Sequence, residues 1–354
     1  MAETVSLRDF RSYERLELAL RPGLVLVVGP NGVGKTNLLE AVHVATQGFS
    51  PRTRTDSQVV RFGAEGARAF VSGRRDDVRM ELEVTVRRGE GKRARLNGAQ
   101  LRAAEQLRTM VSTLVFTPDR LGVVKGPPAA RRAYFDRVLG RIAPARATLP
   151  AEYGAAVAQR NAALRRAAVN AASLDAIEPW SHRVATLGAD LVAARAEVLD
   201  VLGPPFEERA AELGLERASL RYEGEPPTVA ALAAVLERDL ERGVTSLGPH
   251  LDDAVLEAAG VELRSFGSQG EQRLALLALL LAEAEMIAGR TGVAPLLLLD
   301  DVLSELDPQR RRILAERVRS AGQALVTATD AAMLPATPDQ LLEVAPGAVL
   351  EVAA

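Results

Sequence analysis

The residues best suited to chemistry lie near the start of the chain, where residues 29–36 read GPNGVGKT. This fits the pattern G-x-x-x-x-G-K-[ST], in which backbone N–H groups and a helix N-terminus point toward one polyphosphate. In this pattern Lys35 reaches the β- and γ-phosphates, and the hydroxyl of Thr36 holds Mg²⁺. The residues expected to bind a nucleoside triphosphate here are Gly29, Pro30, Asn31, Gly32, Val33, Gly34, Lys35, Thr36 and Asn37.

Two adjacent carboxylates, Asp300 and Asp301, follow a run of four leucines at residues 296–299. The run predicts a buried strand, and a strand that ends in acidic residues is the Walker B pattern. A carboxylate at the carboxyl end of a strand beside the P-loop strand can hold Mg²⁺ through water, and we assign this role to Asp300. Asp301 is then the catalytic base that orients the attacking water. Without the P-loop, such an aspartate would be read as an ordinary loop cap.

Apolar and alternating runs predict the elements that position these residues. Residues 24–28 form a buried strand directly before the P-loop, and residues 37–42 form a helix after it. Further strands are expected at residues 5–7, 15–20, 68–73, 80–87, 295–299, 323–327 and 347–352. Residues 256–259 and 261–266 predict a hairpin, and residues 272–287 and 308–319 predict helices.

The long separation between Lys35 and Asp300 implies a large insertion. Residues 128–242 are rich in Ala, Arg, Leu and Glu with helical spacing. Prolines at 144, 150, 179, 204 and 205 are expected to divide this stretch into separate helices. We therefore expect a discontinuous ATP-binding head, residues 1–125 and 245–354, and a helical lobe, residues 126–244.

Composition and charge limit the classes of function. The chain has 354 residues and no cysteine, so disulfides and cysteine-based zinc sites are excluded. Its apolar runs are too short to span a bilayer, which favours a cytoplasmic protein. Residues 1–150 carry 26 basic and 15 acidic side chains, whereas residues 151–354 carry 18 and 31. The basic half either binds an anionic partner such as nucleic acid or pairs with the acidic half. The basic clusters are Arg52 and Arg54; Arg87, Arg88, Lys92, Arg93 and Arg95; and Lys125, Arg131 and Arg132.

Three shorter motifs lie around the Walker B strand. Residues 268–272 read SQGEQ and begin a helix, so Ser268 and Gly270 offer a second anion site that the P-loop does not need within one chain. Residues 304–307 read SELD. His250 with Asp252 and Asp253 could hold a metal, but adjacent aspartates on a strand point to opposite faces, so a polar turn explains them better.

In this order the motifs resemble the ABC-type ATPases, and within them the branch of DNA repair proteins similar to structural maintenance of chromosomes (SMC) proteins. Residues 268–272 look like the signature motif and residues 304–307 like the D-loop. Residues 7–13, LRDFRSY, are similar to that branch's N-terminal segment, which makes Arg11 the candidate for approaching the nucleotide phosphates. The resemblance implies an α/β fold, an ABC-ATPase-like P-loop head with a mixed sheet flanked by helices and an inserted helical lobe.

A closer resemblance is to the RecF family of bacterial recombination mediators. It rests on residues 116–119 (FTPD), 124–128 (VKGPP) with Arg131 and Arg132, 248–253 (GPHLDD) and 268–273. The resemblance implies ATP as the cofactor, which the P-loop would bind with Mg²⁺, and a homodimer that forms when ATP is bound. Because Ser268 opens its own helix, we expect Ser268 and Gly270 of one copy to meet the nucleotide of the other. The resemblance also implies binding to DNA. The basic first half and the few aromatic side chains favour contact with the phosphates of duplex, gapped or junction DNA, without sequence specificity. The implied protein partners are RecR and RecO and, indirectly, RecA, without a membrane.

The chain departs from the ABC pattern at several positions. Asp301 stands where a glutamate usually follows the Walker B aspartate. No histidine follows the next strand, so we expect slow catalysis in which Thr329 or Asp330 partly substitutes. No glutamine matches the Q-loop, and Leu251 replaces the arginine usual in the RecF-like motif. Two alternatives stay open at this point: the nucleotide-binding subunit of an ABC transporter, and a nuclease-bearing repair ATPase.

Overall fold

The computed structural model describes residues 1–53, 55–75, 78–171 and 173–353, so Arg54 of the first basic cluster lies outside the described residues. The chain forms two compact units. The first comprises residues 1–120, 212–214 and 280–354, and the second comprises residues 121–211 and 215–279. Helix α9 (Gln269–Thr291) contributes residues to both units.

A six-stranded sheet in the first unit carries the predicted nucleotide-binding motifs. Its strand order is β15-β14-β3-β13-β12-β8, and the pairing is parallel except between β14 and β15. The strands are β3 (Leu24–Val28), β8 (Thr113–Phe116), β12 (Leu296–Leu299), β13 (Ala324–Ala328), β14 (Gln340–Ala345) and β15 (Ala348–Val352). The P-loop connects β3 to α1 (Lys35–Gln47), and α10 (Pro308–Ser320) connects β12 to β13. Because the strands are parallel, the P-loop and Asp300 both lie at the carboxyl ends of the strands, on the same side of the sheet.

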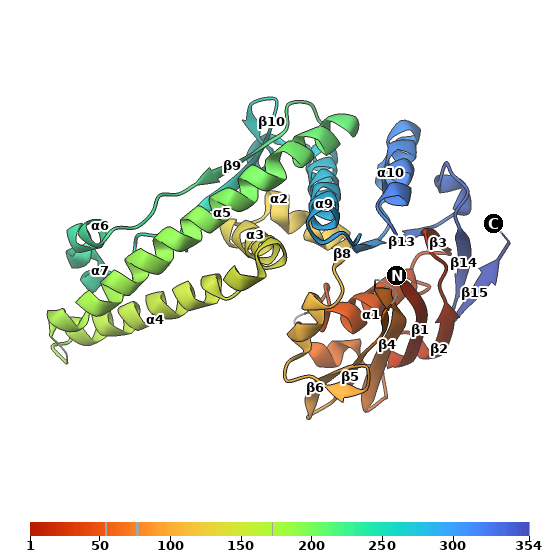
Figure 1. The fold of residues 1–354 in the computed structure, drawn as a ribbon, viewed down its shortest axis with the longest axis horizontal. Helices are drawn as coiled ribbons and strands as arrows, with labels where there is room; N and C mark the ends of the chain where they lie inside the picture. Colours follow the sequence, from red (N-terminus) through yellow and green to blue (C-terminus); the bar gives the residue numbers. More distant parts are fainter. Residues whose placement is uncertain (54, 76–77, 172, 354) are drawn as a thin grey trace. The chain divides into compact units, whose positions relative to one another are not determined.

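The first unit also contains an antiparallel sheet of order β2-β1-β4-β5-β6-β7 (Figure 1). Its strands are β1 (Ala2–Phe10), β2 (Tyr13–Ala19), β4 (Gly66–Arg75), β5 (Val78–Arg87), β6 (Gly91–Leu96) and β7 (Ala99–Gln100). Apolar residues alternate with polar ones, so Leu82, Val84 and Val86 are buried, as the sequence predicted. One core cluster joins the inner face of this sheet to α1 and to the parallel sheet.

The second unit is mainly helical and has a small three-stranded sheet of order β11-β10-β9. Its helices are α2 (Gly122–Lys125), α3 (Pro128–Ile142), α4 (Leu149–Ala168), α5 (Glu178–Glu212), α6 (Val229–Ala234), α7 (Leu236–Arg242) and α8 (Leu263–Phe266). Its strands are β9 (Ser219–Glu223), β10 (Asp253–Ala258) and β11 (Val261–Glu262). The predicted hairpin is therefore present, but its second strand is short, because the chain turns into α8 at Leu263.

One prediction about this unit was wrong. Pro204 and Pro205 do not end a helix but lie inside α5, which has 35 residues and so a length of about 52 Å. The prolines cost the helix backbone hydrogen bonds. Leu202 and Phe206, on either side of them, are fully buried, and this burial keeps the helix continuous.

Buried ion pairs connect elements within the second unit. Helices α4 and α5 lie side by side (Figure 1), and the guanidinium of Arg160 on α4 donates to Ser181 Oγ and to Asp239 Oδ2, at 3.0 and 2.6 Å. His250 Nε2 donates to the carbonyl oxygen of Thr245 at 2.9 Å, and its Nδ1 accepts from the hydroxyl of Tyr153 at 2.8 Å. His250 is thus part of a hydrogen-bonded turn, and the described residues contain no cluster of potential metal ligands.

The boundaries of the compact units differ from the boundaries of the helical lobe that amino-acid composition suggested. Residues 245–279 cluster with the second unit because β10 pairs with β9 along its length. The expected division into an ATP-binding head and a helical lobe concerns which residues bind nucleotide, and it stays a prediction. No helix in the described part of the chain has the length and apolarity needed to cross a membrane.

Candidate functional site

The P-loop lies between β3 and α1, and the side chain of Lys35 is hydrogen-bonded to backbone carbonyl groups of the same loop. Lys35 Nζ donates to the carbonyl oxygens of Gly29 and Pro30 at 2.6 and 3.0 Å. The side chain is buried, and burial lowers the pKa of Lys35, against the opposing effect of the charges of Asp301 and Asp300. A compact ammonium in this position neutralises an anion held by the loop.

Thr36 and Asp300 meet at the carboxyl ends of the strands. The prediction that the Walker B strand lies directly beside the P-loop strand was wrong, because β13 pairs with both and separates them. The hydroxyl of Thr36 lies 2.9 Å from both carboxylate oxygens of Asp300. Strand β13 lies between β3 and β12 in the sheet, so its residue Thr327 also reaches this carboxylate, donating to Asp300 Oδ1 at 2.9 Å. Burial raises the pKa of Asp300, while the hydrogen bonds from Thr327 and Thr36 act in the opposite direction.

Asp301 is held at the start of a turn with its backbone in the left-handed region, at φ 49°. Its N–H donates to Thr327 Oγ1 at 2.8 Å. Its Oδ1 is buried, and no described residue gives it a hydrogen bond. Buried polar atoms rarely lack partners, so this oxygen is suited to a water or an ion. The oxygens of Thr36, Asp300 and Asp301 are the hard ligands that Mg²⁺ prefers, and the residues therefore fit this cofactor.

The turn between β1 and β2 supports the P-loop from one side. The hydroxyl of Tyr13 donates to the carbonyl oxygen of Gly34 at 3.0 Å. A Cβ on Gly34, whose φ is 123°, would lie 2.9 Å from Ser12 Oγ and 3.0 Å from the Tyr13 hydroxyl. Only glycine fits there. Gly32, at φ 80°, has open space around it, which leaves this part of the backbone accessible to a ligand.

Arg11 lies beside the P-loop helix, but its guanidinium already has a partner. Its Nε and one terminal nitrogen donate to the two carboxylate oxygens of Glu40 at 2.9 and 2.7 Å. Glu40 is buried and also accepts from Ser50 Oγ and from Arg52. The pair fixes the turn between β1 and β2 against α1. Contact between Arg11 and nucleotide phosphates stays a prediction.

Ser268 and Gly270 lie in the second unit, at the exposed start of α9. Ser268 Oγ accepts from the N–H of Glu271 at 3.2 Å, and the carboxylate of Glu271 accepts from Ser268 N–H at 2.8 Å. This reciprocal capping box confirms that Ser268 begins the helix. The N–H and the hydroxyl of Ser268 both donate to the carboxylate of Glu271, and these two hydrogen bonds lower the pKa of Glu271. The roles of Ser268 and Gly270 toward nucleotide stay predictions.

The residues proposed to replace the missing switch histidine have local partners. The hydroxyl of Thr329 donates to Met333 Sδ at 3.2 Å, and the carboxylate of Asp330 accepts from the N–H of Ala332 at 2.8 Å. Neither hydrogen bond involves Asp300 or Asp301. Sequence reasoning missed Thr327, which does contact both, because its only signal was its place at the end of a predicted strand.

Comparisons with known proteins agree with this geometry. Residues 1–348 match the model of the RecF/RecN/SMC N terminal domain. The chain is 39% identical to the DNA replication and repair protein RecF of Acidothermus cellulolyticus and 36% identical to that of Streptomyces avermitilis, each over 92% of both chains. The chain belongs to the RecF family.

Solved structures extend the comparison to the fold. The structure described as the recombination mediator protein RecF-ATP in the RecFOR pathway matches with a TM-score of 0.89 and 26% identity, over 99% of this chain and 97% of that one. An Smc head bound to the C-winged helix domain of ScpA has a TM-score of 0.62 at 18% identity, over 100% and 97%, and so shares the fold. The predicted fold class, an ABC-ATPase-like α/β head with helical insertion, is confirmed for this RecF-family chain.

Proposed function

We propose that this RecF-family chain is a cytoplasmic, ATP-dependent DNA-binding protein of recombinational repair, and a slow ATPase. The observation that carries the proposal is the convergence of Thr36, Asp300 and Thr327 beside a P-loop with a buried lysine. Such a site binds a nucleoside triphosphate, and its relatives are RecF proteins, one of them solved with ATP. These relatives favour repair over the transporter and nuclease alternatives.

Each residue of the site has a role that follows from its chemistry. The P-loop N–H groups and Lys35 bind the phosphates, while Thr36 and Asp300 would hold Mg²⁺. When bound, Mg²⁺ supplies charge that neutralises the phosphates. Asp301 orients water through the oxygen that lacks a protein partner. Its side chain is one methylene shorter than the usual glutamate, which is consistent with slow hydrolysis.

The site is completed by a second copy of the chain in this proposal. Ser268 and Gly270 are exposed at the N-terminus of a 23-residue helix, where the positive end of the helix dipole favours an anion. The γ-phosphate held by one copy is bound by these residues of the other. ATP thereby joins two copies around DNA, and hydrolysis releases them.

DNA contact is assigned mainly to phosphates because the first 150 residues are basic and the chain has few aromatic side chains for base stacking. The preferred DNA is duplex with a gap or junction, bound without sequence specificity. RecR and RecO are the proposed protein partners, and loading of RecA at gaps is the proposed outcome.

Two substitutions test the shared site. Lys35→Met removes the ammonium and should abolish ATP binding. Ser268→Arg should block ATP-dependent dimerisation in sedimentation velocity while ATP binding by the monomer stays within a few-fold of wild type. Ser268→Arg also removes a helix cap, so Thr228→Arg, which removes the cap of α6 in the same unit, is the matched control. Equal loss of binding and dimerisation in Ser268→Arg, beyond that of the control, would refute the shared site.

A further inference from the structure

A row of arginines crosses the antiparallel sheet of the first unit. Strand pairing places Arg15 of β2 opposite Arg8 of β1, and Arg8 opposite Arg68 of β4. Arg68 in turn faces Thr85 of β5, and Thr85 faces Arg93 of β6. We call these four arginines and Thr85 the arginine row. Each of the five is exposed or half-buried and directly follows or precedes a buried apolar residue of its strand, so the five lie on one outer face. The row contains no acidic residue. The buried neighbours are Leu7, Leu16, Ala69, Val84 and Ala94.

Like charges directly opposite each other on adjacent strands destabilise a sheet. Arg68 is compensated by Glu83 at 2.6 Å, and Arg93 lies 3.5 Å from Glu90. Arg8 and Arg15 are exposed, and no acidic side chain in the described ranges pairs with either. Arg8 and Arg15 therefore lie directly opposite each other on adjacent strands without an acidic partner among the described residues. This arrangement does not stabilise the sheet, so stability does not explain it.

The row borders a surface groove of about 490 Å³, lined by Arg8, Arg15 and Arg68 together with Arg61. The acids of the groove have partners of their own. Asp9 lies 2.8 Å from Arg61, and Glu14 lies 3.6 Å from it. The third acid of the groove is engaged by the hydroxyl of Ser6, which donates to Glu17 at 2.8 Å.

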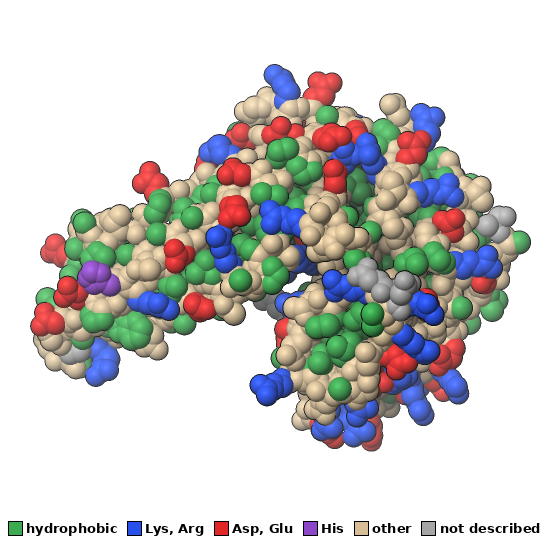
Figure 2. Space-filling model, in the orientation of Figure 1, with side chains coloured by type: hydrophobic (Ala, Val, Ile, Leu, Met, Phe, Trp, Pro, Cys, Tyr) green, Lys and Arg blue, Asp and Glu red, His purple; other side chains and the backbone are tan. Residues whose placement is uncertain are grey.

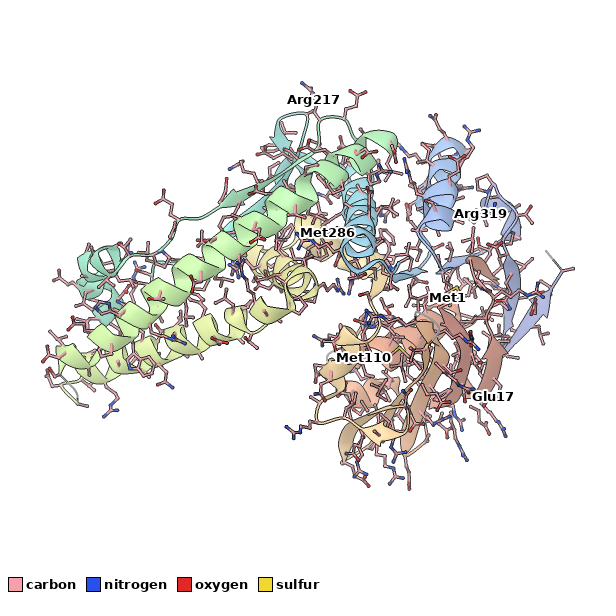
Figure 3. The ribbon with its side chains drawn as sticks, viewed as in Figure 1. Met1, Glu17, Met110, Arg217, Met286 and Arg319 are labelled. Atoms are coloured by element: carbon pink, nitrogen blue, oxygen red, sulfur yellow. The ribbon has the colours of Figure 1, made fainter. Side chains whose placement is uncertain are left out.

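The surface over this sheet carries blue Lys and Arg side chains with red Asp and Glu between them (Figure 2). Glu17, labelled in Figure 3, extends from β2 in the row next to the arginines. The row itself is thus a line of positive charge within a mixed surface.

We infer that the arginine row binds the phosphodiester backbone of nucleic acid. Five strands spaced about 4.8 Å apart extend over roughly 19 Å, which is about the axial length of five or six phosphates on one strand of a duplex. A planar guanidinium can bind a phosphate through two parallel hydrogen bonds. The row places arginines on four of five adjacent strands, with no acidic side chain in the row itself. Such a line matches a regular polyanion better than an acidic peptide, whose carboxylates are irregularly spaced. The inference rests on the proposed function and names the surface through which DNA is contacted.

The double variant Arg8→Thr/Arg15→Thr tests the inference, because threonine fits a strand and removes only the uncompensated pair. The chain offers a close control in Arg74→Thr/Arg79→Thr. Arg74 and Arg79 also face each other on the same sheet, but each is paired with a glutamate, Glu3 or Glu81. Both doubles remove the same charge from exposed strand positions.

Affinity for a gapped duplex is measured by fluorescence anisotropy with ATP and Mg²⁺ over a range of salt. Loss of two phosphate contacts should make the log–log salt slope less steep by about 1.8, an affinity loss of up to about 60-fold at 0.1 M salt. The control should stay near wild type. Without DNA, Arg8→Thr/Arg15→Thr should melt at the same temperature as wild type or higher, since like-charge repulsion is relieved.

The outcomes separate the inference from the proposed function. If wild type binds no DNA, both fail. If wild type binds with a steep salt dependence and the two doubles behave alike, the arginine row is overturned and the proposed function stands. If Arg8→Thr/Arg15→Thr weakens binding of poly-glutamate but leaves duplex binding unchanged, the row contacts an acidic protein and the inference is again overturned.

Discussion

Thr327 offers the sharpest test of how this site is built, through the substitution Thr327→Val. The side chain is completely buried, donates to Asp300 and accepts from the N–H of Asp301. Valine keeps the shape and the strand propensity of threonine but can make neither hydrogen bond. The lost bond to a carboxylate costs about 1.5–3 kcal/mol and the unpaired N–H about 1–3 kcal/mol. Because the two groups are neighbours, these costs overlap, and we expect a total of about 2–4 kcal/mol.

For a unit of roughly 200 residues this loss lowers Tm by roughly 4–16 °C, since each kcal/mol corresponds to about 2–4 °C. Thermal melting followed by circular dichroism measures the shift, and titration with a fluorescent ATP analogue and Mg²⁺ measures the site. Affinity should fall because Asp300 and Asp301 lose the group that orients both. Thr327→Ser keeps the hydroxyl and is the matched control. Equal melting temperatures and equal Mg²⁺–ATP affinities for the two variants would refute the proposed role of the hydroxyl.

Two further predictions concern the second unit. Burial lowers the pKa of His250, so the unfolded chain takes up a proton more readily than the folded one. The contribution of His250 to the free energy of unfolding is therefore fully present above the ordinary histidine pKa of about 6.5. It falls as pH decreases from there toward the lowered pKa. The melting temperature of the wild type should show this loss between about pH 8 and pH 5. His250→Gln cannot be protonated, so its melting temperature should lack the part of the pH dependence that His250 contributes. Identical pH profiles for the two proteins would contradict the assignment. Arg160→Met leaves the fully buried Asp239 without its cation and should destabilise this unit by about 3–5 kcal/mol, as measured by melting. The double variant Arg160→Met/Asp239→Leu should recover part of this stability. If it recovers none, the ion pair is not the cause of the loss.

Local sequence was sufficient for the elements that carry the nucleotide-binding motifs. Strand β3 has the predicted bounds, and β12 and α10 differ from prediction by a single residue at one end. Residues 268–272 begin α9 as expected, and the structure shows that Ser268 and Glu271 cap it reciprocally. These features depend on hydrophobic period and on side chains that bond to backbone within a few residues, and both can be read from the chain.

Other features were not visible locally. Strand β8 was missed because a run of only four residues is too short to distinguish a strand from other buried segments. Its pairing with β12 makes it a strand. The continuation of α5 through Pro204 and Pro205 depends on burial of the flanking side chains, which overrides local propensity.

The sequence by itself determined that the chain has a P-loop, a Walker B strand and a basic first half, because each is written in contiguous residues. Tertiary structure alone decided that Thr327 links Asp300 to Asp301, since strand order in the sheet places β13 between β3 and β12. It also decided that Arg8, Arg15 and Arg68 stand in one row. Their positions in the chain fix only which face of each strand they occupy, whereas register between strands fixes which charges meet.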